Sequence, residues 1–194
     1  MRLAIFASGS GTNAENLIQR TKNGSAKGNV VLVVSDKRQA PVLKKASQLG
    51  VETAEVLPSD FIDKRAYEAY LIEQLHAAKV ELIVLAGYMR LIGPTLLEAF
   101  EGRIVNIHPS LLPLFPGLDA VGQALEAKAK ETGVTIHYVD AGMDTGPVIA
   151  QEKVAIALDD DHASLTTKIQ AVEHQLYPQV VNQIVAEKTR GENE

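Results

Sequence analysis

The sequence predicts a single-domain α/β protein: a mostly parallel, Rossmann-like sheet with helices on both faces and an antiparallel C-terminal extension. In the first half of the chain, short runs of Val, Ile and Leu alternate with helix-length amphipathic segments. Strands that are apolar almost throughout are typical of parallel sheets covered on both faces. Beyond residue 110 this pattern changes, and we expect the antiparallel extension there.

The first half of the chain predicts strands and helices in alternation. Residues 2–7 form an apolar run that is too short for a secretory signal and lacks a cleavage pattern, so we interpret it as a first buried strand. Similar runs predict further strands, and the amphipathic segments between them predict helices. The expected strands are 30–35, 52–56, 81–86 and 103–108, and the expected helices are 12–22, 40–49, 63–78 and 94–100.

The second half opens with a proline-rich loop over 112–117. The elements expected after it are a helix over 119–130, strands over 133–139 and 148–156, and a long helix over 161–187. Three consecutive aspartates at 159–161 favour the start of that last helix, because carboxylates stabilise helix N-termini. The tail over 190–194 is expected to fray.

The composition limits the class of protein. A chain of 194 residues without a linker or repeat is expected to form one domain over 1–194. Its net charge of −5 disfavours a nucleic-acid partner, and no apolar run approaches the roughly 18–20 residues of a membrane span. The absence of cysteine excludes disulfides, thiolate catalysis and cysteine zinc sites, so we expect a cytoplasmic protein with small-molecule ligands.

The most informative stretch is 103–113. Asn106 and His108 lie two positions apart in the expected strand, so their side chains should point to one face while Ile107 packs on the other. Pro109 cannot donate to a strand ladder, so the strand should end at His108, at the sheet edge where open α/β sheets bind ligands. An amide beside an imidazole suits acyl-group chemistry, in which one group holds an oxyanion and the other moves a proton.

A glycine loop over 8–13, Ser-Gly-Ser-Gly-Thr-Asn, follows the first strand and opens the first helix. The free N–H groups of Gly11, Thr12 and Asn13 would favour an anion there, and a monophosphate is the preferred ligand. The dinucleotide pattern G-x-G-x-x-G is incomplete because position 14 is alanine, so a nicotinamide dinucleotide is the second choice. A simple tight turn is the remaining alternative.

Two carboxylates, Asp140 and Asp144, lie in the connection between the last two expected strands. A carboxylate near His108 would favour the imidazolium form and fix the ring, although aspartates are also common turn residues. His137 is interpreted as either a core or a near-site histidine. Neither an H-E-x-x-H motif nor a close histidine pair occurs, so no metal is expected.

Several motifs together carry a resemblance to a known family. They are SGSGTN at 8–13, AGYMRLI at 86–92, NIHPSLLP at 106–113, FPG at 115–117, DAGMDTGP at 140–147 and EHQLYP at 173–178. Over nearly its whole length the chain resembles the phosphoribosylglycinamide formyltransferases, the folate-dependent enzymes of purine synthesis. The resemblance implies transfer of the formyl group of 10-formyltetrahydrofolate to the amine of glycinamide ribonucleotide, with tetrahydrofolate as the second product.

The resemblance also implies roles for individual residues. Asn106 and His108 would hold the formyl oxygen, with His108 as the proton donor, and Asp144 would support the charged imidazole. The residues implied to bind glycinamide ribonucleotide are Gly11, Thr12, Asn13 and Glu173. Those implied to bind 10-formyltetrahydrofolate are Lys64, Met89, Arg90, Leu91, Ile92, Asn106, Asp140 and Asp144.

Two positions depart from the family pattern. Lys64 stands where an arginine is frequent, and lysine cannot offer a bidentate fork, so this contact is left open. Leu114 replaces a residue that is often basic.

The resemblance also implies two halves of the chain. Residues 1–100 would form the nucleotide- and phosphate-binding half and 101–190 the catalytic and folate-binding half. No metal and no nicotinamide is implied, and the oligomeric state is left open, with a homodimer as one alternative.

Parts of the sequence are also compatible with other functions. A formyltetrahydrofolate hydrolase or a methionyl-tRNA formyltransferase would use the same chemistry, but each typically carries a further domain and would be truncated here. The acidic charge also disfavours tRNA. A non-catalytic phosphate-binding module would need only the glycine loop, without Asn106, His108 and Asp144. An NAD-dependent oxidoreductase is weakened by the incomplete glycine pattern.

Overall fold

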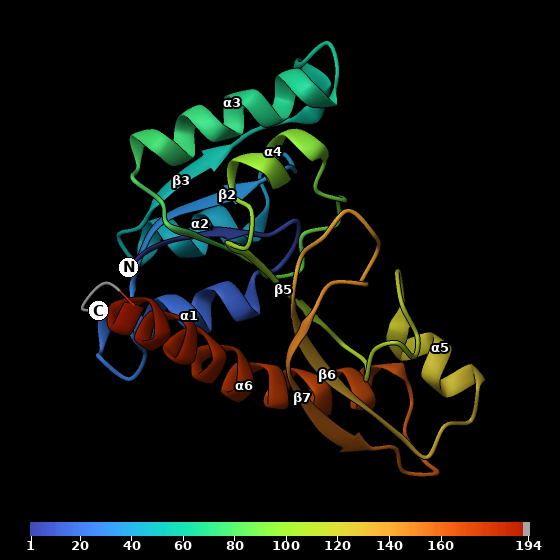
Figure 1. Ribbon diagram of the computed structural model, residues 1–194. Helices are drawn as coiled ribbons and strands as arrows, with labels where there is room; N and C mark the ends of the chain where they lie inside the picture. The colour runs from blue at the N-terminus through green and yellow to red at the C-terminus, as the bar shows by residue number, and fades with distance from the viewer. Residues whose placement is uncertain (192–194) are drawn as a thin grey trace.

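Seven strands form one mixed sheet in the computed structural model, which describes residues 1–191. The strand order is β3-β2-β1-β4-β5-β6-β7; β1 to β5 are parallel, and β6 and β7 are added antiparallel. The strands are β1 (Arg2–Phe6), β2 (Asn29–Ser35), β3 (Glu52–Glu55), β4 (Leu82–Leu85), β5 (Ile104–His108), β6 (Glu131–Tyr138) and β7 (Val148–Ala155). The predicted fold class is confirmed (Figure 1).

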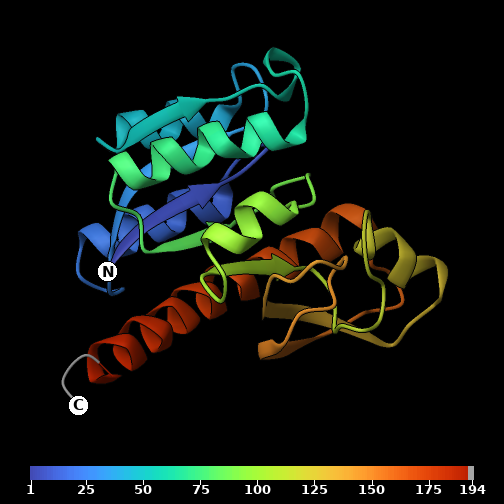
Figure 2. The same cartoon turned by 45° about the horizontal axis from the view of Figure 1, so that its top comes forward.

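Helices cover both faces of this sheet. They are α1 (Thr12–Lys22), α2 (Pro41–Gln48), α3 (Lys64–Ala77), α4 (Pro94–Ala99), α5 (Ala120–Glu126) and α6 (His162–Gly191), with a short 3-10 turn η1 (Pro58–Asp60). Figures 1 and 2 show α3 and α4 on one face and α1 with the long α6 on the other. None of the helices in the described part of the chain has the length and apolar character that a membrane span requires.

The strand pleat divides the core into two layers. On β1, Leu3 and Ile5 pack into the layer with α1, α2 and α6, whereas Ala4 and Phe6 pack into the layer with α3 and α4. This alternation is expected of a strand that is buried on both faces. It explains why the central parallel strands β1, β2 and β4 are apolar almost throughout.

The C-terminal ends of the central strands are staggered. Leu85, the last residue of β4, pairs with Asn106, so Ile107 and His108 continue β5 beyond the end of its neighbour. The buried Tyr177 of α6 donates its hydroxyl to the Leu85 carbonyl at 2.7 Å and to the Val105 carbonyl at 3.2 Å. These two hydrogen bonds fix α6 below the sheet edge at which the side chains of β5 emerge.

Two predicted boundaries were wrong. The helix predicted over 119–130 ends at Glu126, because Lys128 has a left-handed backbone (φ 49°) and turns the chain into β6 at Glu131. Helix α6 continues through Gly191, so the first part of the tail predicted to fray is helical. Residues 192–194 of that tail lie outside the described residues.

Candidate active site

Asn106 and His108 project from the end of β5 toward the same side. Their neighbour Ile107 packs into the layer formed with α6, so the pleat directs the amide and the imidazole to the opposite face. The strand ends at His108, as predicted from Pro109. His108 is only 5% exposed, so the protein rather than solvent sets the orientation of its ring.

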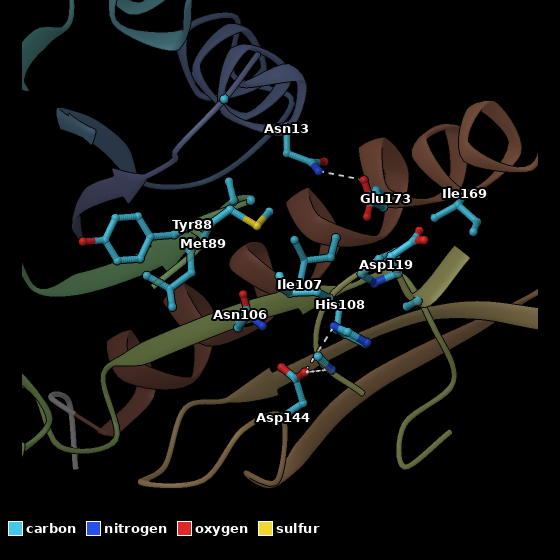
Figure 3. Close-up of a pocket in the computed structure, with 18 of the residues that line it drawn as sticks. Asn13, Tyr88, Met89, Asn106, Ile107, His108, Asp119, Asp144, Ile169 and Glu173 are labelled. Atoms are coloured by element: carbon cyan, nitrogen blue, oxygen red, sulfur yellow. Dashed lines mark hydrogen bonds and ion pairs between the residues drawn. The ribbon is translucent and has the colours of Figure 1, made fainter. Parts of the chain in front are cut away.

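Asp144 reaches the same place from the loop between β6 and β7. Its Oδ2 lies 3.5 Å from His108 Nδ1, and its Oδ1 lies 3.7 Å from His137 Nε2. The Gly117 N–H donates to Oδ2 at 2.8 Å and so fixes the carboxylate. Figure 3 shows this carboxylate directed at the His108 ring. The structure therefore brings the carboxylate of Asp144 to the imidazole of His108, which lies on another element and far from it in the sequence.

The hydrogen bonds of His108 identify the atom that can exchange a proton. Its Nε2 lies 2.8 Å from the Phe115 carbonyl oxygen, which can only accept, so Nε2 carries a hydrogen. Protonation and deprotonation must then occur at Nδ1, the nitrogen that faces Asp144. At 3.5 Å this carboxylate is beyond an ordinary hydrogen bond yet close enough to stabilise a positive ring.

Thr135 of β6 holds the loop that supplies the Phe115 carbonyl. Its hydroxyl donates to the Ser110 carbonyl at 2.6 Å and accepts the Leu112 N–H at 3.0 Å. The side-chain amide of Gln151 on β7 donates to the same hydroxyl oxygen at 2.8 Å. The ring of His108 is therefore oriented by a loop that is itself tied to the two antiparallel strands.

His137 is the second histidine of the site; the sequence left its position open, and the structure places it in the lining of the cavity, beside Asn106. It pairs with Asn106 across β5 and β6, and the Asn106 amide nitrogen lies 3.2 Å from its Nε2. Its Nδ1 donates to the Tyr138 carbonyl at 2.9 Å, so Nε2 of the neutral ring is an acceptor. Burial lowers the pKa of His137, which favours this neutral form.

The glycine loop lies at the N-terminus of α1, as predicted. Gly11 has a left-handed backbone (φ 68°), and a Cβ there would lie 2.2 Å from Val42 Cγ2. Glycine is therefore required both for the turn and for the close approach of α2. The Asn13 side chain donates to Glu173 Oε2 at 2.8 Å, so two residues predicted to bind the nucleotide contact each other.

Glu173 is buried, not solvated as its helix face alone would indicate. It is 7% exposed on α6, and burial raises the pKa of its carboxyl, while the hydrogen bond from Asn13 opposes this shift. A buried carboxylate with a single fixed donor retains free acceptor positions for hydroxyl groups. Figure 3 shows this carboxylate beside Asn13, the last residue of the glycine loop.

The loop after β4 carries apolar side chains on its surface. Met89 is 62% exposed and Leu91 54% exposed, whereas Ile92 is buried. The Met89 N–H donates to Ser8 Oγ at 2.9 Å, and the guanidinium of Arg90 lies 5.9 Å from the centre of the Tyr67 ring. Exposed large apolar side chains around a cavity are typical of a ligand-binding surface.

The structure places the remaining predicted residues less centrally. Lys64 is not among the described residues that line the cavity; its Cε lies against Gly93, behind the loop after β4. Asp140 lines the cavity, and its Oδ1 accepts the Gly142 N–H at 3.0 Å and the Thr145 hydroxyl at 2.8 Å within its own loop. Leu114 is 55% exposed.

One cavity of about 580 Å³ joins the glycine loop, the loop after β4, and the side chains of Asn106, His108 and Asp144. It runs from the glycine loop past Asn106 and His108 to the loop after β4 and to residues 139–144. Asp119 and His162 also line it, with His162 Nε2 2.8 Å from Asp119 Oδ1; no motif indicates this contact, because the two positions are 43 residues apart. Within the described residues, no three His, Cys, Asp or Glu side chains gather as a metal site would require.

Comparison with known proteins identifies the class of protein. A family model described as formyl transferase matches residues 1–181. The chain is 48% identical over 191 residues to phosphoribosylglycinamide formyltransferase of Bacillus subtilis (strain 168), covering 98% of each chain. The chain therefore belongs to the formyl transferase family.

Two further relatives carry the same enzyme name as the Bacillus subtilis protein. The chain is 38% identical over 182 residues to phosphoribosylglycinamide formyltransferase of Escherichia coli (strain K12), covering 94% of this chain and 86% of the relative. The crystal structure of phosphoribosylglycinamide formyltransferase from Bacillus halodurans superposes with a TM-score of 0.93 at 54% identity, over 97% of each chain. The resemblance predicted from the motifs is thus confirmed.

Proposed function

We propose that the chain transfers the formyl group of 10-formyltetrahydrofolate to the amine of glycinamide ribonucleotide, in purine synthesis and in the cytoplasm. The observation that carries this proposal is the single cavity in which Asn106, His108 and Asp144 lie between a phosphate-type loop and an apolar loop. The relatives named above support it. Residues 1–194 would act as one catalytic unit.

The nucleotide would occupy the side of the cavity near α1 and α6. Gly11 is the N-cap of α1, and Thr12 and Asn13 begin its first turn, so their N–H groups have no carbonyl partner within the helix and the helix dipole favours a phosphate there. The carboxylate of Glu173 would accept hydrogen bonds from ribose hydroxyls. This arrangement would direct the amine of the nucleotide toward His108.

The folate would occupy the side of the cavity lined by apolar loops. Met89, Leu91 and Met143 are each at least half exposed there, so a flat heterocycle could be covered without displacing the core. The backbone groups of residues 90–92 make no hydrogen bond to other described residues and are free to recognise the edge of a pterin. The loop over 140–144 would close over the same ring.

The catalytic residues would act on the intermediate formed when the amine attacks the formyl carbon. One amide hydrogen of Asn106 bonds His137, and the second remains to hold the oxyanion. His108 Nδ1 would donate its proton to the folate nitrogen from which the formyl carbon departs, and the attacking amine would release one proton in its place, while Asp144 stabilises the charged ring. A preorganised oxyanion donor contributes about 3–4 kcal/mol, and general acid–base catalysis about 10²–10⁴-fold in rate.

The proposal is tested by mixing the protein with 10-formyltetrahydrofolate and following tetrahydrofolate release, with and without glycinamide ribonucleotide. Release that requires the nucleotide, together with formation of the N-formyl product, would support the transferase. Release without the nucleotide would favour the hydrolase alternative. Binding of the nucleotide without any release would favour the non-catalytic module.

A further inference from the structure

Glu68 of α3 is a buried carboxylate that the catalytic scheme does not use. It is 2% exposed, although glutamate is seldom fully buried without partners. Its Oε1 accepts the Gly93 N–H, and its Oε2 accepts the Leu96 N–H at 3.2 Å. Both donors lie where the loop after β4 enters α4. The carboxylate therefore ties α3 to the end of the loop that carries Met89 and Arg90.

Glu68 replaces a cap that α4 does not have of its own. Gly93 is the N-cap residue of α4, and a residue in this position usually accepts the N–H three residues later through its side chain. Glycine has no such side chain, and Glu68 supplies the missing oxygen to Leu96. The backbone of Gly93 (φ −96°) is open to any residue, so conformation does not require glycine here.

Contact does require glycine at position 93. A Cβ there would lie 2.6 Å from Oε1 and 2.7 Å from Oε2 of Glu68, and 2.7 Å from Cε of Lys64. Lys64 lies one helical turn before Glu68 on the same face of α3. Because position 93 has no side chain, the Glu68 carboxylate and the Lys64 side chain can both pack against the backbone there.

The segment 90–92 is consequently held at its two ends. Before it, the Met89 N–H is bonded to Ser8 Oγ; after it, the Gly93 N–H is bonded to Glu68. Since the backbone groups between these points bond no other described residue, the two anchors and the buried side chain of Ile92 determine where the segment lies.

We propose that Glu68 is a positioning residue for the folate side of the cavity. It sets the place of residues 89–92, and of Lys64 relative to them, without touching either substrate. This inference rests on the proposed function, in which the 89–92 segment contacts 10-formyltetrahydrofolate. Glu68 is buried and does not line the cavity, yet it affects the binding of one of the two substrates specifically.

The first test is Glu68→Gln, with Glu73→Gln as the matched control on the exposed face of the same helix. A glutamine must turn its NH₂ group toward one of the two N–H donors, so one hydrogen bond becomes a contact between donors. We expect the KM for 10-formyltetrahydrofolate to rise by about tenfold, the scale of a lost hydrogen bond to a charged group. The KM for glycinamide ribonucleotide should change by less than about twofold and kcat by less than about threefold, since neither depends directly on the anchor.

The second test is Gly93→Ala, which keeps the Glu68 residue unchanged but pushes its carboxylate away from the backbone. It should raise the folate KM in the same way, and the double variant should be less impaired than the product of the two single effects, because both remove the same contact. Amide hydrogen exchange supplies a readout that needs no substrate. Exchange of the amides at positions 93 and 96 should increase in both variants and not in Glu73→Gln, while residues 8–16 keep the wild-type rate.

Three results would overturn the inference: a folate KM in Glu68→Gln equal to that of Glu73→Gln, equal increases in the KM of both substrates, or loss of the folded state in both Glu68→Gln and Gly93→Ala. Failure of the wild-type chain to transfer a formyl group would instead refute the proposed function. In that case the exchange experiment still tests whether Glu68 holds the loop.

Discussion

Replacement of Asp144 by asparagine should lower kcat by roughly 10³-fold. The variant keeps a side-chain oxygen for the Gly117 N–H and removes the negative charge 3.5 Å from His108 Nδ1. With an effective dielectric constant of about 20, Coulomb's law gives about 5 kcal/mol for a charged ring at this distance. Each 1.36 kcal/mol corresponds to about a tenfold change in rate, and partial relaxation of the loop reduces the effect to about three powers of ten.

Single-turnover formyl transfer with both substrates saturating isolates this effect from binding. Asp159→Asn, which removes an exposed carboxylate of the same type, is the matched control and should leave the rate unchanged. The thermal midpoint of Asp144→Asn should be measured alongside, to show that the folded state persists. A rate within about threefold of the wild type would refute the assignment of Asp144 as the partner of the charged imidazole.

Three further predictions concern stability and binding. Burial raises the pKa of the Glu173 carboxyl, so its ionised form destabilises the folded state as the pH rises from 4.5 through the higher folded pKa. Glu173→Gln should therefore raise the urea midpoint at pH 8 and also raise the KM for glycinamide ribonucleotide. A lower urea midpoint would contradict this. Burial lowers the pKa of His137, so stability should fall as the pH drops from 6.5 through the lower folded pKa. His137→Gln should therefore make the urea midpoint depend less on pH between pH 5 and 8. A pH dependence equal to that of the wild type would count against this assignment. Gly11→Ala should cost at least about 1–3 kcal/mol of stability, because it strains the left-handed backbone and also places a Cβ against Val42. It should weaken nucleotide binding in calorimetry, whereas wild-type binding would contradict the role of the loop.

The fold was predictable because its strands differ from its helices in period and length. All seven strands lie within two residues of the predicted bounds, and Pro109 correctly marked the end of β5. The end of α5 could not be predicted, because it depends on a left-handed Lys128, a conformation that no residue preference for lysine indicates. Helix α6 runs through Pro178 and on to Gly191, beyond the predicted end at 187, and no residue preference near 187 indicates where the helix stops.

The site was predictable where its residues share a strand or a motif. Asn106 and His108 share a face because of the strand period, which requires no tertiary information. Asp144 was a candidate only through its glycine-rich loop and the family resemblance. His137 remained ambiguous because its proximity to Asn106 depends on the register between β5 and β6, and Glu68 was missed because a glutamate on an amphipathic helix is usually solvated.

The antiparallel extension explains how polar catalytic groups can be buried and still serve a cavity. On the α6 side, the β5–β6 pair is apolar, with Val105, Ile107, Val134 and Ile136 in the core. The layer of α3 and α4 includes only Ile104 of β5, so the other face of the pair can be polar, with Asn106, His108, Thr135 and His137. Buried polar groups lower stability unless they are bonded, and here the carbonyls of Phe115, Tyr138 and Ser110 bond three of them. Each ring is thereby held with one nitrogen fixed as a donor, and the nitrogen that remains at His108 is the one that faces Asp144. A further parallel crossover would have placed a helix over this face, and these residues would then have been core positions rather than catalytic ones.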